Sequence, residues 1–288
     1  MVAASALLRL KEIGGRAPPV RLPPDRLARR IAALYRSWRR PGFDLRRLID
    51  RYLDDIALPD DAPMKAVARE LAADLQHWPG HPYHSSLHHA EVANNAMVLA
   101  WLSAGLSEPL GPDDTLLLLV AALGHDRDHD GTSNGETVFR LEAIAAQAVD
   151  LICRRHGVDS RTRAELSTLI LATDATMRPL FHALREARGC PDVELPAELA
   201  ALKSSPRLFR LARLLSDADL MSSAALTKRW SLEQSARLSA EWQKPVDHAC
   251  LVYFFEGMVG RDMLSTAGRY FSGNLQQIRA AALGMGCG

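Results

Sequence analysis

The chain has 288 residues, of which 48% are hydrophobic and 24% charged, and its formal net charge is +1. This composition is typical of a globular domain with a sizeable core and excludes a strongly basic nucleic-acid-binding chain. No run reaches the roughly 18 consecutive apolar residues that a membrane-spanning helix requires. We therefore expect no membrane span and no nucleic-acid partner.

The positive charge is concentrated at the N-terminus, where residues 1–51 hold 13 Lys and Arg against 4 Asp and Glu. We interpret residues 1–45 as a solvated basic extension, and an anionic partner or membrane surface is the alternative. The first fifteen residues lack the uninterrupted apolar core of a signal peptide.

The four cysteines (Cys153, Cys190, Cys250 and Cys287) are scattered along the sequence. Such scattering favours a reducing cytoplasm over a disulfide framework.

Apolar residues recur at helical spacing along most of the chain, and strand signals are nearly absent. In chain order we expect helical segments over 26–40, 64–78, 115–126, 136–157, 163–174, 206–221, 231–242 and 248–264. The segment 115–126 is apolar all round, as a buried central helix would be. Residues 190–206 are expected to form a loop with at most one short helical turn. The sequence thus predicts one all-α domain over 46–288, preceded by the extension 1–45.

Two histidine-rich segments carry the chemistry. His84 and His88 are four residues apart and would share one face of a helix, although a histidine pair alone also occurs in helix caps. His125 and Asp126 follow the apolar segment 116–123 directly and begin a run of six ionisable residues, 125–130. Burying such groups is costly unless they are paired or bind a metal ion. This run therefore predicts a metal site.

Carboxylates elsewhere could complete this site. Asp217 and Asp219 follow an apolar helical segment, and either one could supply the distant ligand, although both could instead cap helices. Glu142, which follows the His-Asp run, could orient an imidazole if it is buried.

Together these segments resemble the HD superfamily, and most specifically the catalytic domain of class I cyclic nucleotide phosphodiesterases. Tyr83 to His88 resembles the family's Tyr-His-Asn-x-x-His signature. The run from His125 to Asn134 matches His-Asp-x-Asp-His-x-Gly-x-x-Asn at every fixed position. Leu-Ala-Thr-Asp occurs at 171–174 and Ala-Asp-Leu at 218–220. The resemblance extends from about Pro82 to Gly260 and implies a compact, multi-helix, all-α phosphodiesterase-type domain.

The resemblance also implies roles for individual residues. It suggests two divalent cations, Zn, Mn or Fe at a tight site and Mg or Mn at a second site bridged by Asp126. Ligands of the tight site would be His88, His125, Asp126 and Asp219. Catalytic roles would fall to His84 as proton donor, Glu142 as its orienting carboxylate, and His129 and Asn134 beside the second site. Substrate contacts would come from Tyr83, Thr173, Met258 and Arg261.

The chain also departs from the family pattern. Ser85 replaces the Asn that follows the first catalytic His, and the segment between Asn134 and Glu142 is much shorter. The family's purine-reading Gln-Val-Gly-Phe segment becomes Met258-Val259-Gly260-Arg261, and a base-contacting Asn falls near Ser222. The metal centre is therefore expected to be intact, whereas the nucleobase reader is altered.

We interpret the chain as an enzyme that hydrolyses a small phosphodiester, most specifically a 3′,5′-cyclic nucleotide. The alternative is a phosphomonoesterase acting on a nucleotide or other small phosphate, with Arg178 and Arg261 binding phosphate. A di-iron variant would need further imidazoles, for which His156 and His182 are the candidates. A non-catalytic scaffold with a structural metal would have no use for a proton donor such as His84. A homodimer is possible on sequence grounds.

Overall fold

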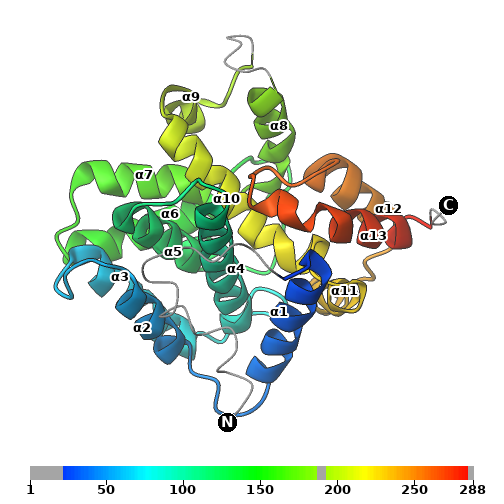
Figure 1. Ribbon diagram of the computed structural model, residues 1–288, viewed down its shortest axis with the longest axis horizontal. Helices are drawn as coiled ribbons and strands as arrows, with labels where there is room; N and C mark the ends of the chain where they lie inside the picture. The colour runs from blue at the N-terminus through cyan, green and yellow to red at the C-terminus, as the bar shows by residue number, and fades with distance from the viewer. Residues whose placement is uncertain (1–21, 187–192, 285–288) are drawn as a thin grey trace.

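The computed structural model describes residues 22–186 and 193–284, and all the regular structure in these residues is helical (Figure 1). Residues 1–21 of the basic extension, Cys190 and Cys287 lie outside the described residues. The α-helices are α1 (Pro24–Trp38), α2 (Leu45–Asp55), α3 (Pro63–His77), α4 (Ser86–Gly105), α5 (Pro112–Gly124), α6 (Arg140–Arg155), α7 (Ser160–Leu171), α8 (Arg178–Glu186), α9 (Ala200–Ser204), α10 (Pro206–Ala224), α11 (Lys228–Trp242), α12 (His248–Val252) and α13 (Ser272–Ala282). Short 3-10 turns are η2 (Ala175–Met177), η3 (Ala197–Leu199) and η5 (Gly268–Phe271), and η4 (Tyr253–Val259) is a π-helix.

The predicted all-α class is confirmed. Helix α1 buries Leu27, Ile31 and Tyr35 on one face, as the spacing of its apolar residues predicts. Helix α5 is buried along most of its length, as expected for 115–126. The single segment expected over 248–264 is instead divided into α12 and the π-helix, which ends at Val259 and is followed by Gly260 with a positive φ of 75°.

Helix α2 and the helical turns within 190–206 were not predicted from the sequence. Helix α2 was missed because charged residues make up about half of it, although Leu48 and Ile49 form a buried face. The segment 190–206, which we expected to be mostly loop, contains η3 and the five-residue α9 in its described part. A helix this short contains too few turns to show a periodic pattern.

Helices α4 and α10 pack side by side at the centre of the molecule, and α5 contacts both (Figure 1). Hydrogen bonds from buried polar side chains fix the surrounding helices to α4. Tyr52 of α2 donates its hydroxyl to Asn94 at 2.6 Å, and Tyr35 of α1 bonds Asn95. Asn95 in turn donates to the Ala218 carbonyl of α10 at 2.8 Å. This packing brings the N-terminal end of α4, the C-terminal end of α5 and the middle of α10 together.

Residues 22–45, which fall within the expected basic extension, include α1 and its buried face. The boundary at residue 45 stays a prediction. In the described part of the chain, no helix combines the length and the apolar character that crossing a membrane requires.

Candidate active site

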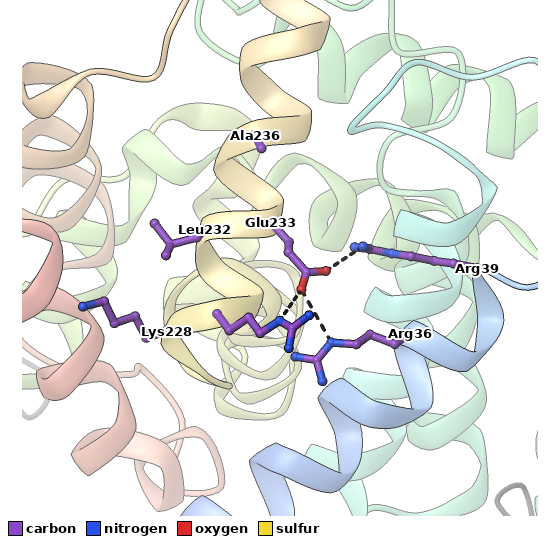
Figure 2. Close-up of a pocket in the computed structure, with 7 residues that line it drawn as sticks. Arg36, Arg39, Lys228, Leu232, Glu233 and Ala236 are labelled. Carbon is purple, nitrogen blue, oxygen red and sulfur yellow. Dashed lines mark hydrogen bonds and ion pairs between the residues drawn. The ribbon is translucent and has the colours of Figure 1, made fainter.

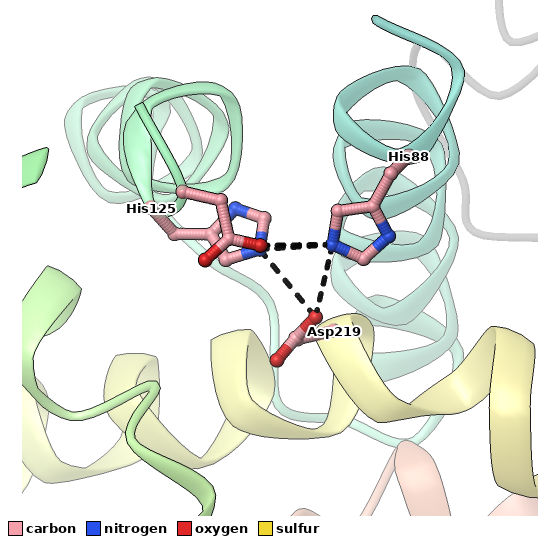
Figure 3. Close-up of side chains that lie close together, drawn as sticks. His88, His125 and Asp219 are labelled. Atoms are coloured by element: carbon pink, nitrogen blue, oxygen red, sulfur yellow. Dashed lines mark hydrogen bonds and ion pairs between the residues drawn. The ribbon is translucent and has the colours of Figure 1, made fainter. Parts of the chain in front are cut away.

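Four side chains, which come from α4, the C-terminal end of α5 and α10, converge on one point (Figure 3). His88 lies in the first turn of α4, His125 caps the C-terminus of α5, Asp126 follows it, and Asp219 lies in α10. The Nε2 atoms of both imidazoles lie 3.0–3.1 Å from Oδ2 of Asp126 and 3.4 Å from Oδ1 of Asp219. The structure therefore brings together all four residues that the sequence singled out as metal ligands.

The electrostatics of this cluster fit a divalent cation. Burial alone would lower the pKa of His88, but the hydrogen bonds and charges of Asp126 and Asp219 outweigh it and raise the pKa to about 9. Burial would raise the pKa of the Asp126 carboxyl, yet the charge of His125 and its neighbours holds this pKa well below its usual range. Protons on the imidazoles thus balance two ionised carboxylates, and a divalent cation would replace these protons.

The donor set also has the chemistry of a metal site. Two imidazole nitrogens and two carboxylate oxygens lie within 4.8 Å of one another, a set that suits Zn, Mn or Fe. His125 donates its Nδ1 proton to the Ala122 carbonyl at 3.0 Å, which directs Nε2 into the cluster. The side chains of Asp126 and Asp219 are 15% and 17% exposed, so the cluster is accessible on the carboxylate side.

His84 lies beside this cluster but not on the helix that carries His88. Helix α4 begins at Ser86 with Ser85 as its N-cap, so the expectation that both histidines share a helical face is wrong. The chain turns immediately before α4 and still brings the two rings together, with centroids 5.6 Å apart. Nε2 of His84 lies 3.7 Å from Oδ2 of Asp126, on the side of the metal ligands.

The carboxylate that holds His84 is Glu241, near the C-terminal end of α11, which sequence reasoning missed. Oε1 of Glu241 lies 2.5 Å from Nδ1 of His84, and Oε2 accepts the backbone N–H groups of Tyr83 and His84 at 2.8 and 3.0 Å. Burial raises the pKa of Glu241, but the hydrogen bond and charge of His84 outweigh it and lower the pKa to about 2. An ionised carboxylate at Nδ1 fixes the orientation of this ring and leaves its Nε2 on the side of Asp126.

Glu142 occupies a different place from the one we expected. It accepts a hydrogen bond from Nδ2 of Asn134 at 2.9 Å, so the orienting role assigned to it belongs by geometry to Glu241. The shortened segment before Glu142 explains the difference, because α6 starts only six residues after Asn134. Burial, together with the nearby Asp174, raises the pKa of Glu142 to about 7 despite the hydrogen bond from Asn134.

His129 and Asn134 shape the loop that follows the ligands. The ring of His129 stacks on that of His84, with centroids 3.5 Å apart and planes 19° from parallel. Nδ1 of His129 accepts the Gly131 N–H at 3.0 Å, and burial lowers the pKa of His129 to about 4, so this ring is neutral. Asn134 accepts the Leu141 N–H at 2.9 Å and thereby joins the loop to α6.

Of the four residues expected to contact substrate, Tyr83 packs against a residue of the cluster, and the contacts of the other three are with other parts of the fold or with solvent. The Tyr83 ring packs 4.9 Å from that of His88, and its hydroxyl lies 3.1 Å from that of Ser223. Thr173 is buried, and its hydroxyl donates to the Ile170 carbonyl at 2.7 Å. Met258 is half-buried in the π-helix, and Arg261 is exposed just beyond it.

Three residues considered for alternative functions have other partners. Arg178 is fully buried and pairs with Asp217 at 3.1 Å, so it is not available to bind phosphate. His156 contacts Glu70 at 2.6 Å, and His182 lies 3.3 Å from the Val259 carbonyl. Neither imidazole contributes to the clusters around His88 or His84 in the described part of the chain.

Comparison with known proteins places this geometry in context. Residues 83–147, which include His84, His88, His125 and Asp126, match the family model described as 3′5′-cyclic nucleotide phosphodiesterase. No curated protein matches the chain.

Solved structures share the fold. The phosphodiesterase domain of the RhoPDE fusion protein from the choanoflagellate Salpingoeca rosetta is similar at a TM-score of 0.63 and 20% identity, over 85% of this chain and 90% of that one. LmjPDEB1 in complex with IBMX is similar at a TM-score of 0.56 and 15% identity, over 97% of this chain and 90% of that one. The helical architecture is that of a phosphodiesterase catalytic domain.

Proposed function

We propose that this chain, an HD-type phosphohydrolase of the 3′,5′-cyclic nucleotide phosphodiesterase family, hydrolyses a small phosphodiester, most specifically a 3′,5′-cyclic nucleotide. The observation that carries the proposal is the position of His84. Its Nε2 lies 3.7 Å from a carboxylate of the metal-ligand cluster while Glu241 holds its Nδ1. A structural metal site has no need of such a proton donor.

His88, His125, Asp126 and Asp219 would hold a tight cation such as Zn, Mn or Fe. Asp126 would also reach a second cation, Mg or Mn, near His129 and Asn134. Two divalent cations, when bound, neutralise phosphoryl charge and make water a better nucleophile. The residues of the chain supply the remaining chemistry, which is to orient the ester and to move a proton.

His84 is the group that moves the proton. Glu241 binds Nδ1, which leaves Nε2 as the nitrogen that donates a proton to the departing ester oxygen. The neutral ring of His129 stacks against His84 and restricts its rotation. A positioned general acid of this kind accelerates a reaction by about 10²–10⁴-fold.

A substrate comparison tests the class of reaction. The Mn²⁺-loaded protein is assayed with bis-p-nitrophenyl phosphate, p-nitrophenyl phosphate and a panel of cyclic nucleotides. We expect the diesters to be hydrolysed and at least one cyclic nucleotide to be a substrate. Hydrolysis of the monoester alone would establish the phosphomonoesterase alternative, in which Arg261 remains an exposed candidate for phosphate binding.

A further inference from the structure

A hollow of about 920 Å³ lies between α1 and α11 (Figure 2). None of the metal ligands and neither His84 nor Glu241 lines it. The lining residues are Arg36, Arg39, Lys228, Arg229, Leu232, Glu233 and Ala236. The hollow is therefore separate from the candidate active site.

Positive charge dominates this hollow, because its lining includes four basic side chains and a single carboxylate. Glu233 lies 2.6 Å from Arg39, 3.5 Å from Arg36 and 3.3 Å from Arg229, so three guanidinium groups share it. Figure 2 shows Arg36 and Arg39 pointing toward Glu233 of α11. An excess of three positive charges remains once Glu233 is counted.

Two of the guanidinium groups are held in place. Arg39 lies over the buried ring of Trp230, 4.2 Å from its centroid, and Arg36 lies 5.7 Å from the same centroid. Their side chains are only 29% and 36% exposed. Side chains fixed in this way lose little conformational entropy when they bind a ligand.

The basic surface continues beyond the hollow. A second hollow of about 460 Å³ shares Arg36, Lys228 and Arg229 with the first. It adds Arg29, which pairs with Asp25 at 2.6 Å, and it is closed on the far side by residues of α13. The two hollows together form one concave basic surface along α1 and the start of α11.

We propose that this surface binds a small anion that carries two or three phosphoryl groups. The three excess charges match the charge of a di- or triphosphate. Guanidinium groups bind phosphate oxygens through paired, charge-assisted hydrogen bonds.

Calorimetric titration with inorganic tripolyphosphate tests the proposal, using the full chain in excess Mg²⁺. The test variant is Arg229→Glu and its matched control is Arg161→Glu. Both arginines occupy the second position of a helix, both pair with a glutamate four residues later, and their side chains are 78% and 87% exposed. Any binding at the metal cluster is common to the three proteins.

The wild type should show saturable binding that weakens as salt is added. Arg229→Glu should raise the Kd about tenfold or more, because a repelling charge replaces an attracting one, whereas Arg161→Glu should change it less than about twofold. Equal losses in both variants would show that only the net charge matters and would overturn the proposal. An absence of saturable binding beyond that of the metal cluster would overturn it as well.

Discussion

At the scale of single residues, Glu241 and His84 are 157 positions apart, yet they form one of the closest contacts in the site. The sequence carries no signal for this pairing, because a glutamate near the end of an amphipathic helix is normally a solvated residue. The contact depends on how α11 lies against α4. That arrangement is fixed partly by Gln234 and Arg237, which both reach the buried Glu91 of α4.

Replacing Glu241 with Gln tests its role as the positioning residue for His84. We expect kcat to fall by about 10–100-fold, a typical effect of removing an outer hydrogen-bond partner from a catalytic group, with KM and metal content little changed. Steady-state kinetics and metal analysis on the same preparation measure this. Glu142→Gln is the comparison for the alternative assignment. A larger loss of kcat in Glu142→Gln than in Glu241→Gln would contradict the role given to Glu241.

Glu142 makes stability depend on pH. Its pKa of about 7 in the folded protein exceeds the ordinary value of 4.5. Its ionised form therefore opposes folding, and stability is lost as the pH rises through this range. Chelator-treated Glu142→Gln should gain stability relative to the wild type by about 2 kcal/mol between about pH 5.5 and 8.5. Urea unfolding of both proteins at several pH values across this range measures the difference in stability. If the difference in unfolding free energy between Glu142→Gln and the wild type does not widen as the pH rises, the raised pKa of Glu142 is refuted.

At the scale of elements, Asp217 of α10 binds the loop before η5, and it lies two positions from the candidate ligand Asp219. It is fully buried and pairs with Arg178. It also accepts the backbone N–H groups of Leu264 and Ser265 at 2.9 and 2.7 Å. The Ala-Asp-Leu match favours Asp219 over Asp217 as the candidate ligand, and the structure gives Asp217 these structural contacts instead.

Asp217→Ala should destabilise the protein by about 3–5 kcal/mol, because it leaves the Arg178 guanidinium buried without its partner. The surface variant Asp150→Ala removes a carboxylate that also pairs with two arginines, Arg154 and Arg163. It should cost about 1 kcal/mol or less. Denaturant unfolding compares the two variants. Similar small losses in both would show that the buried pair contributes little to stability.

Metal removal tests whether a bound cation connects three helices, since the four candidate ligands come from α4, the end of α5 and α10. A cation held by all three should stabilise the fold by about 2.7 kcal/mol at a hundredfold excess over its Kd. The Tm should therefore rise with Mn²⁺ and fall with a chelator in the wild type, and it should respond little in His125→Ala. Equal responses in both proteins would place the binding elsewhere.

At the scale of the whole molecule, the all-α fold and the convergence of His88, His125, Asp126 and Asp219 were accessible from the sequence. All four residues lie in short motifs whose spacing is local, and the apolar segments before His125 and Asp219 indicate that both approach the core. Residues without such motifs were not accessible. Three features depend on how helices that are distant in the sequence pack together. They are the contact of Glu241 with His84, the position of Glu142 beside Asn134, and the basic surface along α1 and α11.

The most direct test of the central claim compares wild type with His84→Ala on bis-p-nitrophenyl phosphate, with metal per chain determined on the same samples. His84 is not among the four candidate ligands His88, His125, Asp126 and Asp219, so the content of tightly bound metal should be equal in both proteins. Turnover should fall by about 10²–10⁴-fold in the variant. Unchanged turnover at equal metal content would contradict the assignment of His84 as the proton donor of a metal-dependent phosphodiesterase.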